Sequence, residues 1–275
     1  MAKRSMMDQF HELKEANQET ILFFRMGDFY ELFHDDAEVG SNVLGLALTS
    51  RDKNAEHPIP MAGFPWHQLE ENLRVMLRAG YKVTVAEQEE ELREGAKLLE
   101  RVVTRIYTPG SLYEESLIGS DASALLCSLM VNDEQVAMSM IDASTGQAWA
   151  VSFGGDGKWA SIYDEIMRWN PSELVLTPKD AERSELLHML GMLDSVVVSQ
   201  HSYQSKRASE RLKTMLEVND LGHLDLGQSP QALQATALAA DYLATVHRHD
   251  DIAIRDVDIQ ELSLIHISEP TRHGL

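Results

Sequence analysis

An aromatic residue and a carboxylate two positions apart are the leading chemical candidates in the sequence. Phe29 and Glu31 lie in the run FFRMGDFYELF (residues 23–33), directly after Gly27 and Asp28. Residues i and i+2 of an extended chain share a face, and Gly-Asp is typical of a turn. A stacking ring beside a hydrogen-bonding carboxylate suits a flat, partly polar ligand such as a nucleobase. On this stretch alone the spacing is more typical of a strand that buries its rings and leaves the carboxylate in solvent, so the pair leaves both interpretations open.

Other chemical patterns in the chain have simpler interpretations. Residues 154–158 (GGDGK) lack the Gly-x-x-x-x-Gly-Lys-Ser/Thr spacing of a phosphate loop, so we predict a turn. Residues 247–251 (HRHDD) have neither a cysteine pair nor a His-Glu-x-x-His pattern beside them, and they are typical of a polar helix end. The acidic run 87–91 is typical of a solvated surface. The sequence contains no strong catalytic signature and no predicted metal site.

Composition limits the class of protein. The 275 residues are enough for two domains, and 44% hydrophobic with 25% charged residues is ordinary for a globular protein. No apolar run reaches the ~18 residues needed to span a bilayer, and the N-terminus lacks a secretory apolar region. The single cysteine, Cys127, fits a buried strand and a reducing compartment. We therefore expect a cytoplasmic protein that does not insert into a membrane.

The charge distribution limits how the chain could meet nucleic acid. A formal net charge of −20 argues against such a partner, because most nucleic-acid binders have a basic surface. Residues 1–110 hold 13 Lys and Arg against 19 Asp and Glu, whereas the remaining 165 hold 11 against 25. A DNA contact through the first part would therefore use few phosphates, and the rest of a larger assembly would supply others.

The elements that would position Phe29 and Glu31 follow from periodicity and turn residues. Residues 59–67 contain two prolines and a glycine, which predicts neither a helix nor a central strand. For the first part of the chain we predict helices at 5–18, 35–44, 69–79 and 89–101, and strands at 21–24, 29–33, 46–50, 81–86 and 102–107.

A polar stretch without clear periodicity, residues 111–122, predicts a domain boundary. Three adjacent strands follow it, and then a helix and a further strand, which favours a second mixed α/β domain. The predicted strands are 124–131, 135–142, 147–153 and 173–177, and the predicted helices are 159–169, 181–193, 205–219 and 230–247.

Five blocks of the first part, in order, resemble the N-terminal mismatch-recognition domain of the MutS family. One block would be weak, but five in the family's order and at compatible spacing are specific. The likeness continues more weakly through residues 142–146, 170–174 and 239–243, which are similar to the family's RNase H-like connector domain. The five blocks are residues 24–37, Leu48–Arg51, Ile59–His67, Glu87–Gln88 and Val103–Gly110.

The resemblance implies an α/β fold with defined domain limits. It places a mixed-sheet mismatch-recognition domain at 1–111, a linker at 112–122 and an RNase H-like connector at 123–248. Residues 249–262 would begin the family's core domain. Residues 263–275 do not continue the likeness and read like translated vector sequence, so they are left out of the fold argument.

The resemblance also implies roles for individual residues. Phe29 would wedge beside a mispaired or unpaired base from the minor groove, and Glu31 would hydrogen-bond that base. Met26 and Arg105 match family positions at or near DNA. Arg51 is either a phosphate contact or an ordinary surface arginine. Inserting an apolar wedge costs a few kcal/mol of unstacking, which is lower where pairing is faulty. A carboxylate near DNA needs a base donor or a proton of its own.

Three departures from the family pattern stand out. The usual Asp-Pro after Glu87-Gln88 is missing, Trp66 replaces a tyrosine, and the likeness stops after Leu262. The family's levers, clamp and ATPase are not matched, so we expect no enzyme activity and no cofactor for this part. The resemblance assigns ATP and Mg²⁺, a second MutS subunit and MutL to a full-length parent, which would bind double-stranded DNA with mismatches or small loops.

The sequence also leaves other functions open. A paralogue that binds branched DNA is one, although the presence of both Phe29 and Glu31 argues against it. A stand-alone interaction module is another. A metal-dependent nuclease built on the RNase H-like domain would need several clustered acidic ligands, and Asp142 alone does not make such a site.

Overall fold

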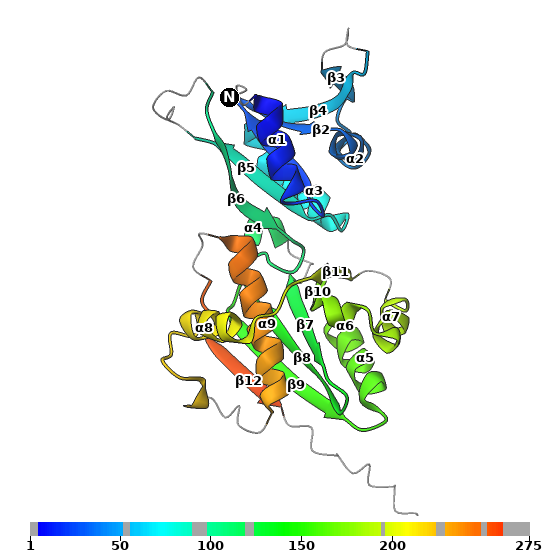
Figure 1. The fold of residues 1–275 in the computed structure, drawn as a ribbon, viewed down its shortest axis with the longest axis vertical. Helices are drawn as coiled ribbons and strands as arrows, with labels where there is room; N and C mark the ends of the chain where they lie inside the picture. The colour runs from blue at the N-terminus through cyan, green and yellow to red at the C-terminus, as the bar shows by residue number, and fades with distance from the viewer. Residues whose placement is uncertain are drawn as a thin grey trace, which may run out of the picture.

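The computed structural model describes residues 5–51, 56–89, 98–118, 124–193, 196–223, 229–248 and 252–260. The chain forms two lobes, each built on a mixed six-stranded sheet, and they meet where β6 of the first lobe leads toward the second (Figure 1). This confirms the predicted α/β class.

The first sheet has the strand order β3-β4-β2-β1-β5-β6. β1 pairs antiparallel with β2 and parallel with β5, so two apolar strands lie in the middle of the sheet. The predicted strand 46–50 is shorter and later in the structure, at Thr49–Arg51. The strands are β1 Ile21–Met26, β2 Phe29–Phe33, β3 Thr49–Arg51, β4 Ile59–Pro65, β5 Val83–Gln88 and β6 Arg101–Tyr107.

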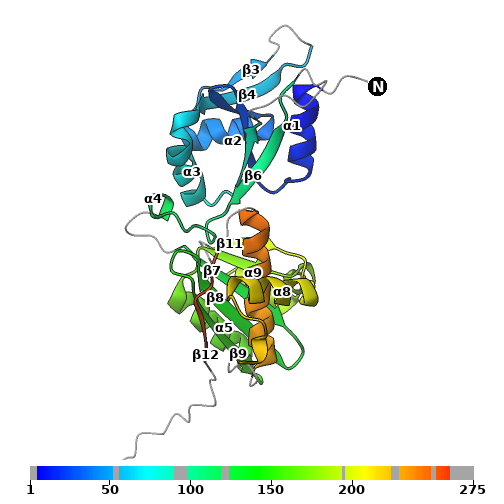
Figure 2. The ribbon, with the colours of Figure 1, turned by 90° about the vertical axis from the view of Figure 1, so that its left-hand side faces the viewer.

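Helices cover both faces of this sheet, as Figure 2 shows. α1 (Met6–Glu15) begins at a capping box between Ser5 and Asp8 and packs Phe10 on the face that carries Phe24 and Phe33. α2 (Asp35–Leu44) and α3 (Leu69–Arg78) cover the opposite face. Each face of the sheet therefore has its own apolar core.

The expectation that residues 59–67 hold no central strand was wrong. β4 lies between β3 and β2 and pairs with both. Its prolines are tolerated because Pro65 is the last residue of the strand, and because β3, the partner of Pro60, is only three residues long. The carbonyl of Pro60 accepts a hydrogen bond from His34 N at 3.0 Å.

The second sheet has the strand order β11-β10-β7-β8-β9-β12. α5, α6 and α7 pack on one face, and α8 and α9 on the other (Figure 1). The strands are β7 Leu125–Val131, β8 Gln135–Asp142, β9 Gln147–Gly154, β10 Glu173–Leu176, β11 Val197–Gln200 and β12 Asp256–Gln260. The helices of this lobe are α5 Lys158–Trp169, α6 Pro178–Ala181, α7 Ser184–Leu190, α8 Ser205–Met215 and α9 Pro230–His247. The short helix α4 (Glu115–Ile118) packs on the core of the first lobe instead.

The segment expected to open a further domain belongs partly to this sheet. Residues 256–260 form β12, which pairs parallel with β9. Arg255 N also donates to Gly146 O at 2.7 Å, and Ile254 N donates to Met215 O at 2.9 Å. The edge of β9 offers unpaired backbone groups, and this segment uses them, so the second sheet extends past the predicted limit at 248.

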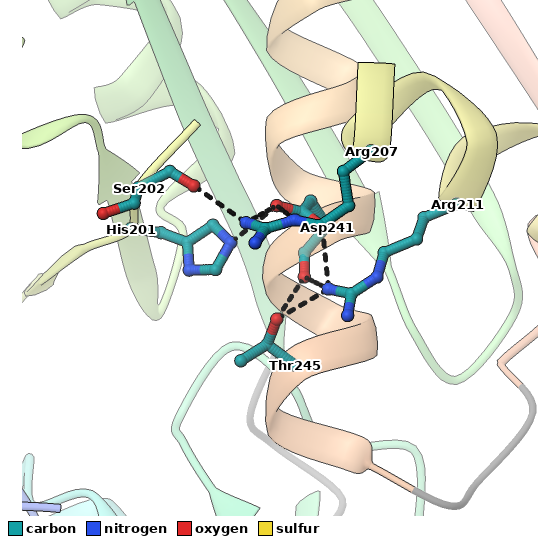
Figure 3. A network of polar contacts seen from close by, with 6 residues as sticks. All are labelled: His201, Ser202, Arg207, Arg211, Asp241 and Thr245. Carbon is teal, nitrogen blue, oxygen red and sulfur yellow. Dashed lines mark hydrogen bonds and ion pairs between the residues drawn. The ribbon is translucent and has the colours of Figure 1, made fainter. Parts of the chain in front are cut away.

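A buried carboxylate joins α8 to α9 (Figure 3). The side chain of Asp241 is fully buried and accepts from Arg207 Nη2 at 2.6 Å, Arg211 Nη1 at 2.7 Å and His201 Nε2 at 2.9 Å. Burial alone would raise the pKa of Asp241, but the hydrogen bonds from Arg207 and His201 and the charge of Arg211 lower it. The network holds two helices of one face together.

Two predictions fall on residues outside the described ranges. Residues 90–97 of the expected helix 89–101 and the tail 263–275 both lie there. The described end of that expected helix, residues 98–101, is not helical, because Arg101 begins β6. In the part of the chain that the structure describes, no helix is both long and apolar enough to cross a membrane.

Candidate nucleic-acid interface

The ring of Phe29 stands at the tip of the β1–β2 hairpin. Met26 pairs with Phe29 across the two-residue turn, and Gly27 takes a positive φ of 58°, which side chains disfavour. Asp28 O accepts from Trp66 N at 2.9 Å, which ties the turn to the end of β4. Phe29 is 48% exposed although Tyr30, the next residue of β2, is buried. A large apolar side chain is therefore held in solvent by an anchored turn.

Glu31 is recessed on the same face of β2. Its neighbours across the sheet are Phe24 on β1 and Gly63 on β4. A Cβ at Gly63 would lie 2.9 Å from Tyr30 O and 3.6 Å from Glu31 Cγ, so glycine is needed for this close approach. Phe29 is thus exposed and Glu31 half-buried, which is the reverse of a strand that buries its ring and leaves its carboxylate in solvent.

The carboxylate of Glu31 has an unused acceptor. Its Oε2 atom is buried and has no hydrogen-bond partner among the described residues. Loss of hydration raises the pKa of Glu31, and the nearby charges of Arg51 and Arg101 lower it less than burial raises it. A buried acceptor without a donor is costly. The site therefore favours either a proton on Glu31 or a donor from a bound ligand.

Two guanidinium groups flank Glu31. Arg51 lies over the ring of Phe33, with its Cζ 6.0 Å from the ring centroid. Arg101 lies over the ring of Phe24 at 5.5 Å. Arg51 is thus a half-buried neighbour of Glu31. This position is compatible with both roles expected for Arg51, a phosphate contact and an ordinary surface arginine. Arg101 was missed, because only the pairing of β5 with β6 brings it near.

The fixed position of Arg101 depends on Gln88. Gln88 Oε1 accepts from Arg101 Nη2 at 2.9 Å and from Gly27 N at 3.4 Å. Arg101 also donates to Arg25 O at 3.2 Å through Nε. The predicted Glu87-Gln88 block therefore links β6 to the hairpin turn and is more than a solvated acidic surface.

Met26 lies close to this group, and Arg105 does not. Met26 is half-buried beside the α1-side core and faces Phe29 across the turn. The side chain of Arg105 is only 6% exposed and forms an ion pair with Glu114. Its guanidinium lies 4.4 Å from the ring of Tyr107 and 4.6 Å from that of Tyr113. The expectation that Arg105 contacts DNA does not fit this burial.

A cavity of about 740 Å³ lies on the other side of the sheet and does not include the Phe29–Glu31 pair. Tyr30 and Trp66 line it together with Arg25, which lies over both rings. Tyr30 donates a hydrogen bond to Glu87. Burial, and then the hydrogen bond to Glu87 and its charge, raise the pKa of the Tyr30 hydroxyl above its ordinary value of 10.0. Strand alternation thus separates this hollow from the candidate site.

The remaining sequence candidates have structural roles. Asp142 Oδ1 accepts from Ser144 N at 2.9 Å and Ser144 Oγ at 2.6 Å, so it shapes the β8–β9 turn. His247 is the last residue of α9 and is buried. Within the described ranges, no three His, Cys, Asp or Glu side chains come together as metal ligands.

The fold and the site define a two-domain α/β protein whose first domain presents an exposed ring beside a recessed carboxylate. The family model of MutS domain I matches residues 4–116, and that of MutS domain II matches residues 124–255. The chain belongs to the MutS family.

Curated relatives agree with this assignment. The DNA mismatch repair protein MutS of Staphylococcus aureus strain bovine RF122 / ET3-1 is 32% identical over 252 residues, and so is that of strain JH9. The match covers 92% of this chain and 27% of each relative. The chain thus spans about a quarter of the length of these relatives.

Proposed function

We propose that the first domain recognises mispaired or unpaired bases in double-stranded DNA, with Phe29 as the wedge. The observation that carries the proposal is an exposed ring on an anchored turn, next to a buried acceptor that lacks a donor. An apolar wedge unstacks a base step at a cost of a few kcal/mol. That cost falls where pairing is already faulty, so the ring selects a lesion by its deformability and not by its base sequence.

Glu31 would add discrimination by bonding the displaced base. A charged carboxylate is repelled by phosphates, but a protonated one donates a hydrogen bond to a base acceptor. Burial already raises the pKa of Glu31, and a nearby duplex would raise it further by excluding water and adding negative charge. Met26 would support the ring from across the turn, and Arg51 would face the DNA backbone beside Glu31.

The wider activity would belong to a longer protein. By its family, such a parent would act as a dimer in which one subunit wedges at the lesion. ATP and Mg²⁺ would bind outside these two domains, which themselves would need no cofactor and catalyse no reaction. MutL and a second MutS subunit would be its partners, and the cytoplasm its compartment.

A binding experiment with two duplexes tests the wedge. Fluorescence anisotropy at micromolar protein would compare a labelled duplex containing one mismatch with its matched counterpart. Base–aromatic stacking is worth about 1–3 kcal/mol, so F29A should weaken mismatch binding about 5- to 150-fold and leave matched binding nearly unchanged. W66A is the matched control, because Trp66 is a similarly exposed ring outside the proposed contact.

The same experiment tests Glu31. E31A should reduce the ratio of mismatched to matched affinity more than it changes the matched affinity itself. E71A, an exposed carboxylate on α3, should change neither. Equal losses on both duplexes for F29A and E31A would count against base recognition and would indicate a general DNA contact.

A further inference from the structure

A buried carboxylate of the second domain binds the backbone of the turn that links the two domains. Glu173, the first residue of β10, is fully buried. Its Oε2 atom accepts a hydrogen bond from Gly110 N at 3.0 Å. None of the ion pairs among the described residues involves Glu173. An isolated buried charge is expensive, so its hydrogen-bond donors decide whether it is tolerated.

The other donors to Glu173 come from its own domain. Ser199 Oγ on β11 and Tyr242 Oη on α9 both donate to Glu173 Oε1 at 2.5 Å. Burial, and then the neighbouring Glu173 charge, raise the pKa of Tyr242, which keeps its hydroxyl a donor. These two bonds leave Oε2 for the linking turn. Glu173 Oε2 is therefore an acceptor of the second domain whose donor, Gly110 N, belongs to the linking turn.

The fit at Gly110 leaves no room for a side chain. A Cβ at this position would lie 2.7 Å from Glu173 Cβ and 3.0 Å from Leu126 Cδ1. Real Cβ atoms do not approach so closely, and the colliding Glu173 atom is next to the main chain and has little freedom to move. Even one methyl group at Gly110 would push the turn away from the second domain.

A second set of contacts surrounds this bond. His247 Nε2, at the end of α9, donates to Ser111 O at 2.7 Å. The ring of Tyr113 lies 5.4 Å from that of His247. Arg105 on β6 lies against Tyr113 and pairs with Glu114, so the first sheet is connected to the same turn. The buried Arg105 thus has a place in the junction.

We propose that Glu173 is a positioning residue that fixes the orientation of the first domain on the second by binding the turn at Gly110. β6 runs directly into this turn at Tyr107, and β10 is a strand of the second sheet flanked by β7 and β11. A fixed turn therefore makes the two sheets move as one body. The orientation of the first domain on the second does not depend on the proposed function. Its consequence for DNA, that the ring of Phe29 has a fixed direction relative to the second domain, rests on the proposed function.

Pulsed electron spin resonance would measure this orientation in the whole chain. Spin labels on E71C of α3 and K179C of α6 would lie on exposed positions of the two domains. The native Cys127 is fully buried, and burial raises the pKa of its thiol, so it should stay unlabelled. The wild-type pair should give one narrow distance distribution.

Three variants and one control test the contact. G110A and E173A should each broaden the distribution about twofold or add a second distance, because two orientations then have similar energies. E173Q should restore a narrow distribution, since an amide oxygen still accepts from Gly110 N while the hydroxyls of Ser199 and Tyr242 accept its N–H groups. G157A is the control, because a Cβ at Gly157 meets nothing within 4 Å.

Each outcome decides the proposal. Narrow distributions for G110A and E173A, with far-ultraviolet circular dichroism unchanged, would overturn it. If E173A does not fold, G110A alone decides. If G110A loses the fold of the second domain, monitored by Trp149 and Trp169, the contact is part of that core and the proposal fails. A failure to bind mismatched DNA would leave all these distances unchanged, so the two proposals fail separately.

Discussion

At the scale of single residues, Glu31 shows how a strand prepares a polar group for a ligand. Gly63 removes the side chain that would fill the adjacent place on β4, and Phe24 and Phe33 each carry a guanidinium beside the carboxylate. The two arginines keep the carboxylate tolerable without hydrogen-bonding its buried Oε2 atom. The Glu31 carboxylate is therefore tolerated in the fold, and its Oε2 atom is still available to a hydrogen-bond donor from a ligand.

The raised pKa of Glu31 predicts how stability depends on pH. A carboxyl group whose folded pKa lies above its unfolded value favours folding when protonated, so its contribution decreases as pH rises through the folded pKa. E31Q should therefore unfold at a higher temperature than wild type at pH 8, and the difference should shrink toward pH 4. Thermal melts at several pH values would check this. A melting temperature of E31Q below wild type at pH 8 would contradict it.

At the scale of elements, the second domain is held together by a charged network between α8 and α9. Asp241 is fully buried, whereas Arg207 and Arg211 each keep about a third of the side chain exposed. The buried Asp241 carboxylate is the shared partner of both arginines. Removing it leaves two guanidinium groups without their acceptor, and each must find a new partner. Removing a surface partner has no such cost.

We expect D241A to lower the free energy of unfolding by about 2–4 kcal/mol. E210A breaks an exposed pair with Lys213 on the same helix and should cost about 0.5 kcal/mol or less. Because the pKa of Asp241 is lowered, its contribution is present above the ordinary value of 3.8 and is lost as pH falls below it. Urea unfolding followed by tryptophan fluorescence would measure the free energy of unfolding of both variants. Equal losses in D241A and E210A would contradict the difference expected between a buried and an exposed ion pair.

Local patterns predicted the elements that surround the candidate site. The apolar run before Gly27-Asp28 and the alternation after it predicted β1, the turn and β2, and alanine-rich residues after Ser229-Pro230 predicted α9. The likeness to MutS identified the family, which the comparisons confirm. These features depend on residues that lie close together in the chain, so local sequence patterns are enough to predict them.

Long-range pairing decided what could not be predicted. Arg101 approaches Glu31 only because β6 pairs with β5, and β12 joins β9 across more than a hundred residues. Prolines mark β4 as irregular, yet they are tolerated because Pro60 faces the short strand β3 and Pro65 ends β4. The burial of Arg105 depends on Glu114 and Tyr113 in the linker, where periodicity gave no signal.

At the scale of the whole molecule, charge limits the proposed DNA contact. The formal net charge is −20, and Arg101, one of the two guanidinium groups beside Glu31, is largely buried. Each neutralised phosphate steepens the salt dependence by about 0.9 in the log–log slope. We expect a slope of about −2 to −3 for this chain on a mismatched duplex.

Anisotropy titrations between about 50 and 200 mM salt would measure this slope. R51A tests the contribution of Arg51 and should make the slope shallower by about one, because Arg51 would face a phosphate. A slope steeper than about −5 would show a broad phosphate interface that the charge distribution does not suggest.

The collision at Gly110 has a consequence for the natural variation of these proteins. A side chain at this position would meet the Cβ of residue 173, which every residue except glycine carries, and a glycine at 173 loses the acceptor for the turn. Positions 110 and 173 should therefore either stay Gly and Glu together or change together. Lineages in which both have changed would be those that have released the first domain from the second during their descent.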